Sequence, residues 1–298
     1  MSEGYLQYHD VLILGDSFSR VKPGTSWANH FTVETGLSVA VDRIHKFESV
    51  LFSKVFVESP PKLVILQTVE RDFAFWLSAM NKTLSRYGIS GAVPHKQDAI
   101  PIDPLTLVPD DIKIVQKDDF SDFDHRLSVT INLISKGFKR ALGYHSPKVR
   151  LVSKRPGSQA VFSSINQDSI AILAKDFDAL TVSNRQLNSA IAGYNLLSGY
   201  VSSIGITNLD LLIIPDRRST YFEFLKAGKL GVREGLFERV QSKINVFNAK
   251  TVLRNAAARN VQDIYFPMDT HLSAIGSKIL AISYKDWLLE KDVLTLSN

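Results

Sequence analysis

A serine closes an apolar run near the start of the chain. In VLILGDSFSR, the residues Val11 to Leu14 are followed by Gly15, Asp16 and Ser17. Gly, Asp and Ser are the usual residues of a plain turn, so the stretch alone leaves two interpretations open. The strand either ends in an ordinary loop or holds Ser17 at the rim of a sheet as a nucleophile. A nucleophilic serine needs a neighbouring base, and that base needs a carboxylate to orient it.

His271 is the histidine best placed to be this base. It lies in FPMDTHLSAIG, two residues after Asp269 and just before the last predicted helix. In an Asp-x-His pair, the carboxylate can accept the proton of one imidazole nitrogen while the other nitrogen faces a crevice. Alone, the pair could be a helix cap. Together with Ser17 after the first strand, it predicts a serine site for acyl transfer.

Other chemistries have little support in the sequence. The chain has no cysteine, which excludes disulfides, thiolate catalysis and thiolate metal sites. The remaining histidines do not have the His-x-His or i, i+4 spacing, with a nearby carboxylate, of a metal site. A glycine-rich phosphate loop is also missing. We therefore expect neither a metal nor another cofactor.

Four short apolar runs predict strands buried on both faces, with helical stretches such as TSWANHFTVET and residues 44 to 57 between them. The runs are Val11 to Leu14, Leu37 to Val41, Leu63 to Gln67 and Leu209 to Ile214. Alternation of strands and helices predicts a parallel sheet with helices on both sides. Ligands bind such sheets outside the carboxyl ends of the strands, which is where Ser17 falls.

The rest of the chain predicts an interruption of this pattern. A helix beginning near Arg71 leads into a Pro- and Asp-rich irregular segment and then into shorter elements. The predicted segments are an irregular stretch at 88 to 125, helices at 127 to 142, 184 to 204, 219 to 228, 233 to 247, 251 to 259 and 273 to 290, and strands at 149 to 153, 160 to 163, 169 to 173 and in DIYF. We predict one domain over residues 1 to 298, with an insertion at approximately 84 to 182.

The net charge of +5 is unevenly distributed: residues 136 to 155 hold seven Lys and Arg and no acid, and residues 98 to 124 hold eight Asp and two Lys. A basic face could attract a polyanion. We favour ordinary solvated surface and no nucleic-acid partner, because neither a nucleic-acid motif nor interleaved aromatics accompany the basic stretch. No apolar run approaches the roughly eighteen residues of a membrane span, and the first residues lack the pattern of a secretory leader.

Two blocks of the chain resemble a known family. VLILGDSFS is similar to the first block of SGNH (GDSL-type) hydrolases, and MDTHLSAIG is similar to their closing Asp–His block. The Asp-x-His spacing, in place of Asp-x-x-His, resembles the AlgX/AlgJ-like branch, which is associated with O-acetylation of exported polysaccharides. The stretches 64 to 73, 161 to 177 and 211 to 225 also resemble that branch. Residues 74 to 150 have no recognisable counterpart.

The resemblance implies a three-layer α/β/α SGNH-hydrolase fold, which is flavodoxin-like, with a parallel sheet and a large insertion. It makes Ser17 the nucleophile, His271 the general base and Asp269 the carboxylate that orients it. Asp16 would shape the turn, and neighbouring backbone N–H groups would help to form an oxyanion hole. The AlgX and AlgJ proteins themselves place Asp-x-His before the serine, whereas here Ser17 comes first, so alginate specificity is not carried over.

The family's oxyanion glycine and asparagine have no clear match, since TVERDF stands where Gly-x-Asn-Asp would be. Arg71, held by Glu70, could donate in their place; the alternative is a structural ion pair at a strand end. Tyr221 could line the crevice or belong to the core. For both Arg71 and Tyr221, the sequence favours the two alternatives equally.

The expected function is serine-dependent transfer of an acetyl group to or from a carbohydrate. The resemblance favours a polysaccharide O-acetyltransferase with an acyl-Ser17 intermediate. The alternatives are a carbohydrate acetylesterase and a non-catalytic glycan-binding or scaffold protein. The implied partners are a polysaccharide or oligosaccharide acceptor and an acetyl donor, for which a membrane acyltransferase is one candidate. The resemblance implies the periplasm or cell envelope, with the cytoplasm as the alternative because no leader is seen.

Overall fold

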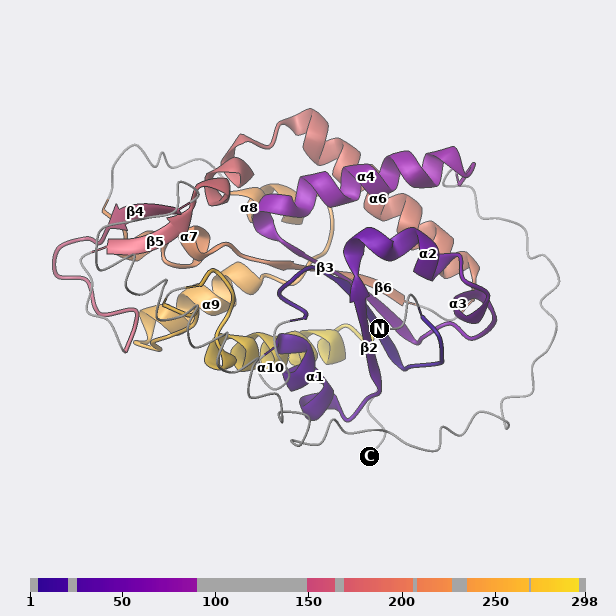
Figure 1. Ribbon diagram of the computed structural model, residues 1–298, viewed down its shortest axis with the longest axis horizontal. Coiled ribbons are helices and arrows are strands. Elements are labelled where there is room, and N and C mark those ends of the chain that lie inside the picture. Colours follow the sequence, from indigo (N-terminus) through magenta and orange to yellow (C-terminus); the bar gives the residue numbers. More distant parts are fainter. Residues whose placement is uncertain are drawn as a thin grey trace, which may run out of the picture.

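A parallel sheet forms the centre of the computed structural model, which describes residues 5–20, 26–89, 149–163, 169–205, 208–226, 235–267 and 269–294. Within these residues the sheet has four strands in the order β2-β1-β3-β6, and each neighbouring pair is parallel (Figure 1). The strands are β1 (Val11–Gly15), β2 (Val39–Arg43), β3 (Leu63–Val69) and β6 (Asn208–Ile214). The predicted α/β class with a parallel sheet is therefore confirmed.

Three of the four strands are largely apolar and buried, as the sequence pattern predicts. All residues of β1 and β3 are buried, and β6 is buried from Asp210 onward. The expectation for the second strand is only partly correct. It begins at Val39 rather than Leu37, and none of its residues is fully buried. β2 is an edge strand with a strand neighbour on one side only, but β6 at the other edge is largely buried, so the position at the edge does not by itself explain the exposure of β2.

Helices cover both sides of the sheet. In Figure 1, α4 and α6 lie on one side, and α1, α9 and α10 lie on the other. The helices are α1 (Trp27–Thr35), α2 (Phe47–Leu51), α3 (Lys54–Glu58), α4 (Phe73–Arg86), α6 (Asn184–Ser203), α7 (Arg217–Thr220), α8 (Leu236–Gln241), α9 (Ala249–Ala258) and α10 (Ala274–Glu290). The first of them has the predicted limits, since the Ser26 hydroxyl caps its start and Gly36, with a φ of 70°, ends it.

Several predicted elements differ in the structure. The helix expected over residues 44 to 57 is divided into a 3-10 turn, α2 and α3, because Ser53 interrupts it and caps α3 through the N–H of Phe56. The helices expected at 219 to 228 and 233 to 247 are shorter. Residues 160 to 163 do not form a strand, and DIYF contributes only an isolated bridge between Tyr265 and Leu272.

Two further strands pair apart from the central sheet. β4 (Val149–Ser153) and β5 (Ser169–Leu173) form an antiparallel pair, at the two positions predicted for strands. In Figure 1 this pair lies at one end of the molecule, away from β2. From residue 90 onward, the irregular segment predicted at 88 to 125 lies outside the described residues, as do the helix predicted at 127 to 142 and much of the predicted insertion.

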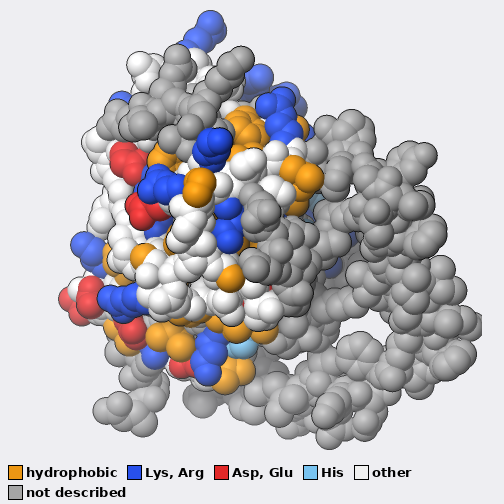
Figure 2. Space-filling view, turned by 90° about the vertical axis from the view of Figure 1, so that its left-hand side faces the viewer, with side chains coloured by type: hydrophobic (Ala, Val, Ile, Leu, Met, Phe, Trp, Pro, Cys, Tyr) orange, Lys and Arg blue, Asp and Glu red, His pale blue; other side chains and the backbone are white. Residues whose placement is uncertain are grey.

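The end of the molecule on the left of Figure 1 has a mixed surface. Figure 2 shows Lys and Arg side chains there dispersed among acidic, hydrophobic and uncharged ones. Arg150, Lys154 and Arg155 are the described members of the basic stretch 136 to 155, and the others lie outside the described residues. In the part of the chain that the structure describes, no helix combines the length and the apolar character needed to cross a membrane.

One carboxyl group of the core predicts a pH effect on stability. Asp210 on β6 is buried and accepts a hydrogen bond from the Tyr284 hydroxyl of α10. Burial raises its pKa to about 7, against the hydrogen bond from Tyr284, which lowers it. A carboxyl whose pKa is higher in the folded than in the unfolded protein favours folding when protonated. Its contribution therefore becomes less favourable as the pH rises from about 4 to about 7.

We expect Asp210→Asn to raise the free energy of unfolding by about 1–3 kcal/mol at pH 8, because the amide cannot ionise yet still accepts from Tyr284. The gain should vanish below about pH 4. Urea denaturation at several pH values measures it. Asp286→Asn, at a more exposed carboxyl paired with Lys285, is the matched control and should change little at any pH. A gain for Asp210→Asn that is independent of pH would contradict the explanation.

Candidate active site

The structure brings together Ser17, His271 and Asp269. The Ser17 Oγ lies 2.9 Å from the His271 Nε2, although the two residues are 254 positions apart. The His271 Nδ1 lies 2.7 Å from an Asp269 Oδ1. With the proton on Nδ1, the imidazole donates to the carboxylate and leaves Nε2 free to accept from the serine hydroxyl. This is the geometry of a serine nucleophile, its base and an orienting carboxylate.

The turn that carries Ser17 is fixed by the side chain before it. The Asp16 carboxyl is held at both oxygens: one accepts from the N–H of Phe18 at 2.9 Å, and the other accepts from the N–H of Val69 at 2.8 Å. Burial raises the pKa of Asp16, and these hydrogen bonds oppose that rise. Asp16 therefore shapes the turn, as expected, and also ties the end of β1 to the end of β3.

A second set of contacts supports the same turn from inside the sheet. The Gln67 Oε1 on β3 accepts from the backbone N–H of Asp16 at 3.1 Å and from the Ser19 hydroxyl at 2.6 Å. The indole N–H of Trp27 donates to the Ser19 Oγ at 3.2 Å. Gln67, Ser19 and Trp27 are all buried. Sequence reasoning did not identify them, because contacts between a strand, a turn and a helix leave no local spacing pattern.

A glycine is required at position 15 because the Gln67 and Ser19 side chains lie where a Cβ of residue 15 would be. A Cβ on Gly15 would lie 2.8 Å from the Gln67 Oε1 and 2.7 Å from the Ser19 Cβ, which is too close for ordinary contact. We expect Gly15→Ala to lower the free energy of unfolding by about 1–3 kcal/mol and to lower turnover as well, because the turn must shift. Thermal unfolding and ester turnover measure the two effects.

Gly199→Ala is the matched control for Gly15→Ala. Gly199 lies within α6, and a Cβ there would meet nothing within 4 Å. Since alanine is the better helix former, this variant should be neutral or up to about 1 kcal/mol more stable. If Gly15→Ala behaved like Gly199→Ala, close packing against Gln67 would not explain the glycine.

The loop before α10 positions His271. The carbonyl of His271 accepts from the N–H of Phe266 at 3.1 Å, and the carbonyl of Phe266 in turn accepts from the buried guanidinium of Arg217. Ser273 lies two residues after His271. Its hydroxyl caps α10 by accepting from the N–H groups of Ile275 and Gly276. His271 is thus held between a fixed loop and the first turn of a long helix.

The His271 side chain is partly exposed and packs against an aromatic ring. The side chain is 25% exposed, and the ring of buried Phe18 packs against it with centroids 4.8 Å apart. The hydrogen bond from His271 is the main cause that lowers the pKa of Asp269 to about 2. The carboxylate therefore stays ionised over the whole neutral range and can stabilise an imidazolium.

The backbone donors next to Ser17 are mostly occupied. The N–H of Asp16 donates to Gln67 and that of Phe18 to Asp16. The N–H of Ser17 donates to no acceptor in the described part of the chain. Among the described residues, the N–H of Ser17 is the one of these neighbouring groups that has no acceptor and could bind a ligand.

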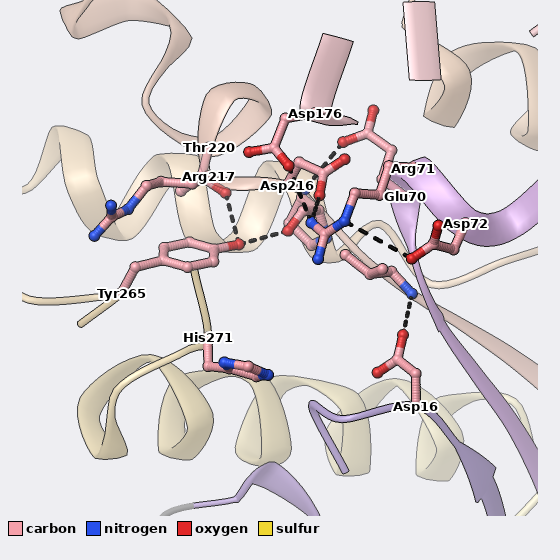
Figure 3. A network of polar contacts seen from close by, with 12 residues as sticks. Asp16, Glu70, Arg71, Asp72, Asp176, Asp216, Arg217, Thr220, Tyr265 and His271 are labelled. Carbon is pink, nitrogen blue, oxygen red and sulfur yellow. Dashed lines mark hydrogen bonds and ion pairs between the residues drawn. The ribbon is translucent and has the colours of Figure 1, made fainter. Parts of the chain in front are cut away.

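Arg71 takes part in ion pairs at the end of β3, which is the structural alternative that the sequence left open. Its guanidinium pairs with Asp176 at 3.1 Å and with Asp216, and its side chain is 10% exposed. Asp72 lies 3.7 Å from its Nε. Figure 3 shows Arg71 among these carboxylates, with His271 apart from the cluster. Burial would lower the pKa of Arg71, but the three carboxylates together raise it, so the guanidinium is a fixed cation.

The expectation for Glu70 is also corrected. Its carboxyl accepts from the backbone N–H of Asp216 at 3.1 Å, and no ion pair of the described residues joins it to Arg71. Burial raises the pKa of both Glu70 and Asp216. Asp176 and Asp216 were missed as partners of Arg71, although Asp216 lies two residues after the end of β6, close to a strand end as Asp16 is. The rule that functional residues follow parallel strands could have found it.

Tyr221 belongs to the core, not to the crevice. Its side chain is fully buried, and its hydroxyl accepts from the N–H of Tyr265 at 3.3 Å. Burial raises the pKa of Tyr221 to about 12. Tyr265 in turn donates to the carbonyl of Pro215 at 2.6 Å. The pair fastens the loop that precedes His271 to the end of β6.

Among the described residues, no group of three or more His, Asp or Glu side chains is arranged to hold a metal ion. No family model, curated protein or solved structure matches the chain. The interpretation of the site therefore depends on its own geometry.

Proposed function

We propose that this protein is an SGNH-type serine enzyme that transfers acetyl groups by way of an acyl-Ser17 intermediate. The observation that carries the proposal is the continuous contact from the Ser17 hydroxyl through the His271 imidazole to the Asp269 carboxylate. The serine follows the first strand of a parallel sheet and the histidine precedes the last described helix. Both positions agree with the resemblance to the SGNH family, AlgX/AlgJ-like branch.

The first half-reaction forms the acyl enzyme. The Ser17 Oγ attacks the carbonyl carbon of the acetyl donor, and its proton moves to the His271 Nε2. The Asp269 carboxylate stabilises the resulting imidazolium. The C–O bond to the leaving group then breaks, the leaving oxygen takes the proton from His271, and the acetyl group stays on Ser17 as an ester.

The second half-reaction returns the enzyme to its starting state. A hydroxyl of the acceptor loses its proton to the His271 Nε2 as its oxygen attacks the acyl carbon. The bond to the Ser17 Oγ breaks, and this oxygen recovers the proton. In both halves, the free N–H of Ser17 is the backbone group available to stabilise the negative charge on the carbonyl oxygen.

Transfer to a polysaccharide in the cell envelope is the form of the reaction that we propose, on the strength of the family resemblance. Water in place of the sugar would make the same residues an acetylesterase. The test supplies an activated acetyl ester with and without an oligosaccharide and follows both free acetate and acetylated sugar. Acetyl-sugar formed at the expense of acetate supports the transferase. Acetate release that no acceptor changes supports the esterase.

The non-catalytic alternative predicts a different result, which can be tested on the same protein. If it is correct, the unmodified protein gives no turnover and no covalent adduct with a serine-directed phosphonate. A phosphonate bound to Ser17, identified by peptide mass analysis, would exclude the scaffold alternative.

A further inference from the structure

A pocket opens beside the nucleophile. It has a volume of about 480 Å³ and is lined by Gly15, Asp16, Ser17, Arg20, Arg43, Ile44, His45 and Trp76. These residues come from the end of β1, the turn after it, the end of β2 with the following 3-10 turn, and α4. The volume is in the range of small-molecule sites and is far larger than an acetyl group needs. The pocket can therefore hold a sugar-sized group next to Ser17.

Two arginines give this pocket positive charge. Arg20 and Arg43 are both exposed, and none of the ion pairs within the described ranges includes either of them. The one acid of the lining, Asp16, has each carboxyl oxygen bound by a backbone N–H. The buried Arg71 and Arg217, by contrast, are held by protein acceptors. Guanidinium groups bind carboxylate, sulfate and phosphate oxygens in pairs, so the pocket favours an anion.

An aromatic wall lies beside these charges. The His45 ring stacks on the Trp76 indole, with centroids 6.3 Å apart and planes inclined by 29°. Phe75 contacts Trp76 edge-on, with centroids 4.9 Å apart, and is 65% exposed. Flat aromatic side chains bury the apolar face of a ligand while its polar groups stay free for other partners. A sugar ring has such a C–H face, whereas a bare inorganic anion does not.

We propose that this pocket is the acceptor subsite and that it selects a sugar unit bearing an anionic group. The ring would lie against His45 and Trp76, the anion would bind Arg20 and Arg43, and a hydroxyl of the same or the next unit would face Ser17. The inference rests on the proposed acyl transfer for its role as acceptor subsite. Binding of an acidic sugar can be measured without that reaction.

The experiment measures binding by calorimetry to the full chain carrying Ser17→Ala, so that no turnover occurs. The probes are three oligosaccharides of equal length: one of glucuronic acid, one of sulfated glucose and one of neutral glucose. We expect at least one acidic probe to bind about tenfold or more tightly than the neutral probe. The preferred probe then identifies the anion as a carboxylate or a sulfate. Equal affinity for all three would overturn the proposal.

Substitutions of residues in the pocket lining test which of them contact the bound oligosaccharide. In the same background, Arg20→Gln and Arg43→Gln should each weaken the acidic probe about tenfold and leave the neutral probe unchanged. Trp76→Ala should weaken both probes by about threefold to tenfold. The matched control is Arg86→Gln, at an exposed arginine of α4 outside the pocket lining, which should change neither. If neither Arg20→Gln nor Arg43→Gln changed the affinity for the acidic probe, the assignment of these arginines to anion binding would be wrong.

The two proposals fail in different ways. If the unmodified protein does not turn over an activated ester while the acidic probe still binds through Arg20 and Arg43, the catalytic proposal fails and the subsite stands. If the ester is turned over while acidic and neutral probes bind alike, the enzyme stands and the subsite fails.

Discussion

Replacing Ser17 with alanine should lower turnover of an activated acetyl ester by about four orders of magnitude or more, because the variant has no oxygen to form the acyl intermediate. The fold should be unaffected. Ser17 is exposed, and the side-chain contact of its hydroxyl is with His271, so the free energy of unfolding should change by less than about 0.5 kcal/mol. Steady-state kinetics and thermal unfolding measure the two effects on the same preparation.

A second exposed serine provides the control. Ser49 on α2 is also exposed, and its hydroxyl donates to a backbone carbonyl at 2.9 Å, that of Lys46. Ser49→Ala should retain full turnover. If Ser17→Ala also kept its activity, the nucleophile would have to be another residue, and the contact with His271 would have no catalytic meaning.

Replacing Arg71 with methionine should lower the free energy of unfolding by about 3–5 kcal/mol at neutral pH. The side chains of Asp176 and Asp216 are fully buried, and each has one oxygen without a partner in the described structure. Without the guanidinium, their negative charge is uncompensated. Burial already raises the pKa of both carboxyls, and the neighbouring Asp176 adds to the rise at Asp216.

The pH dependence of the Arg71→Met effect has a definite sign. Without Arg71 the two carboxyls favour their protonated forms in the folded protein, so the variant should lose least stability in acid and more as the pH rises. Urea denaturation at acidic and neutral pH tests this. Arg86→Met, at an exposed arginine of the same helix region, should change stability by less than about 0.5 kcal/mol.

Adding Asp216→Asn to Arg71→Met should recover part of the loss, because one of the two buried charges is then gone. A variant without Arg71 that is as stable as the original protein would show that the ion pair contributes nothing to the fold.

The parts of this structure that could be predicted are those with a local cause. Continuous apolar runs mark the buried strands, and those of β1 and β6 end at Gly15 and before Pro215. A hydroxyl residue before an apolar stretch and a glycine after it mark α1. Ser17 and His271 were identifiable because each stands at the end of an element, where the topology of a parallel sheet fixes its approximate position.

The parts that could not be predicted have causes far apart in the sequence. Arg71 binds Asp176, 105 positions away, and Asp216, 145 positions away, so neighbouring residues such as Glu70 suggested the wrong partner. Tyr221 has an aromatic ring and a hydroxyl, which suit a core and a crevice equally well; its burial is decided by the packing of Tyr265 and Phe162 around it. His45 and Trp76 meet only once β2 and α4 are in place.

Ser17 and His271, the proposed nucleophile and base, are 254 positions apart, and contact between α1 and α10 connects the segments that carry them. Trp27 on α1 contacts Tyr284 on α10 with ring centroids 6.0 Å apart, and His271 immediately precedes α10. During synthesis on a ribosome, residue 17 emerges long before residue 271. A nascent chain therefore cannot form the proposed Ser17–His271 pair until residue 271 has been synthesised, and a polypeptide terminated before that point would lack the proposed activity.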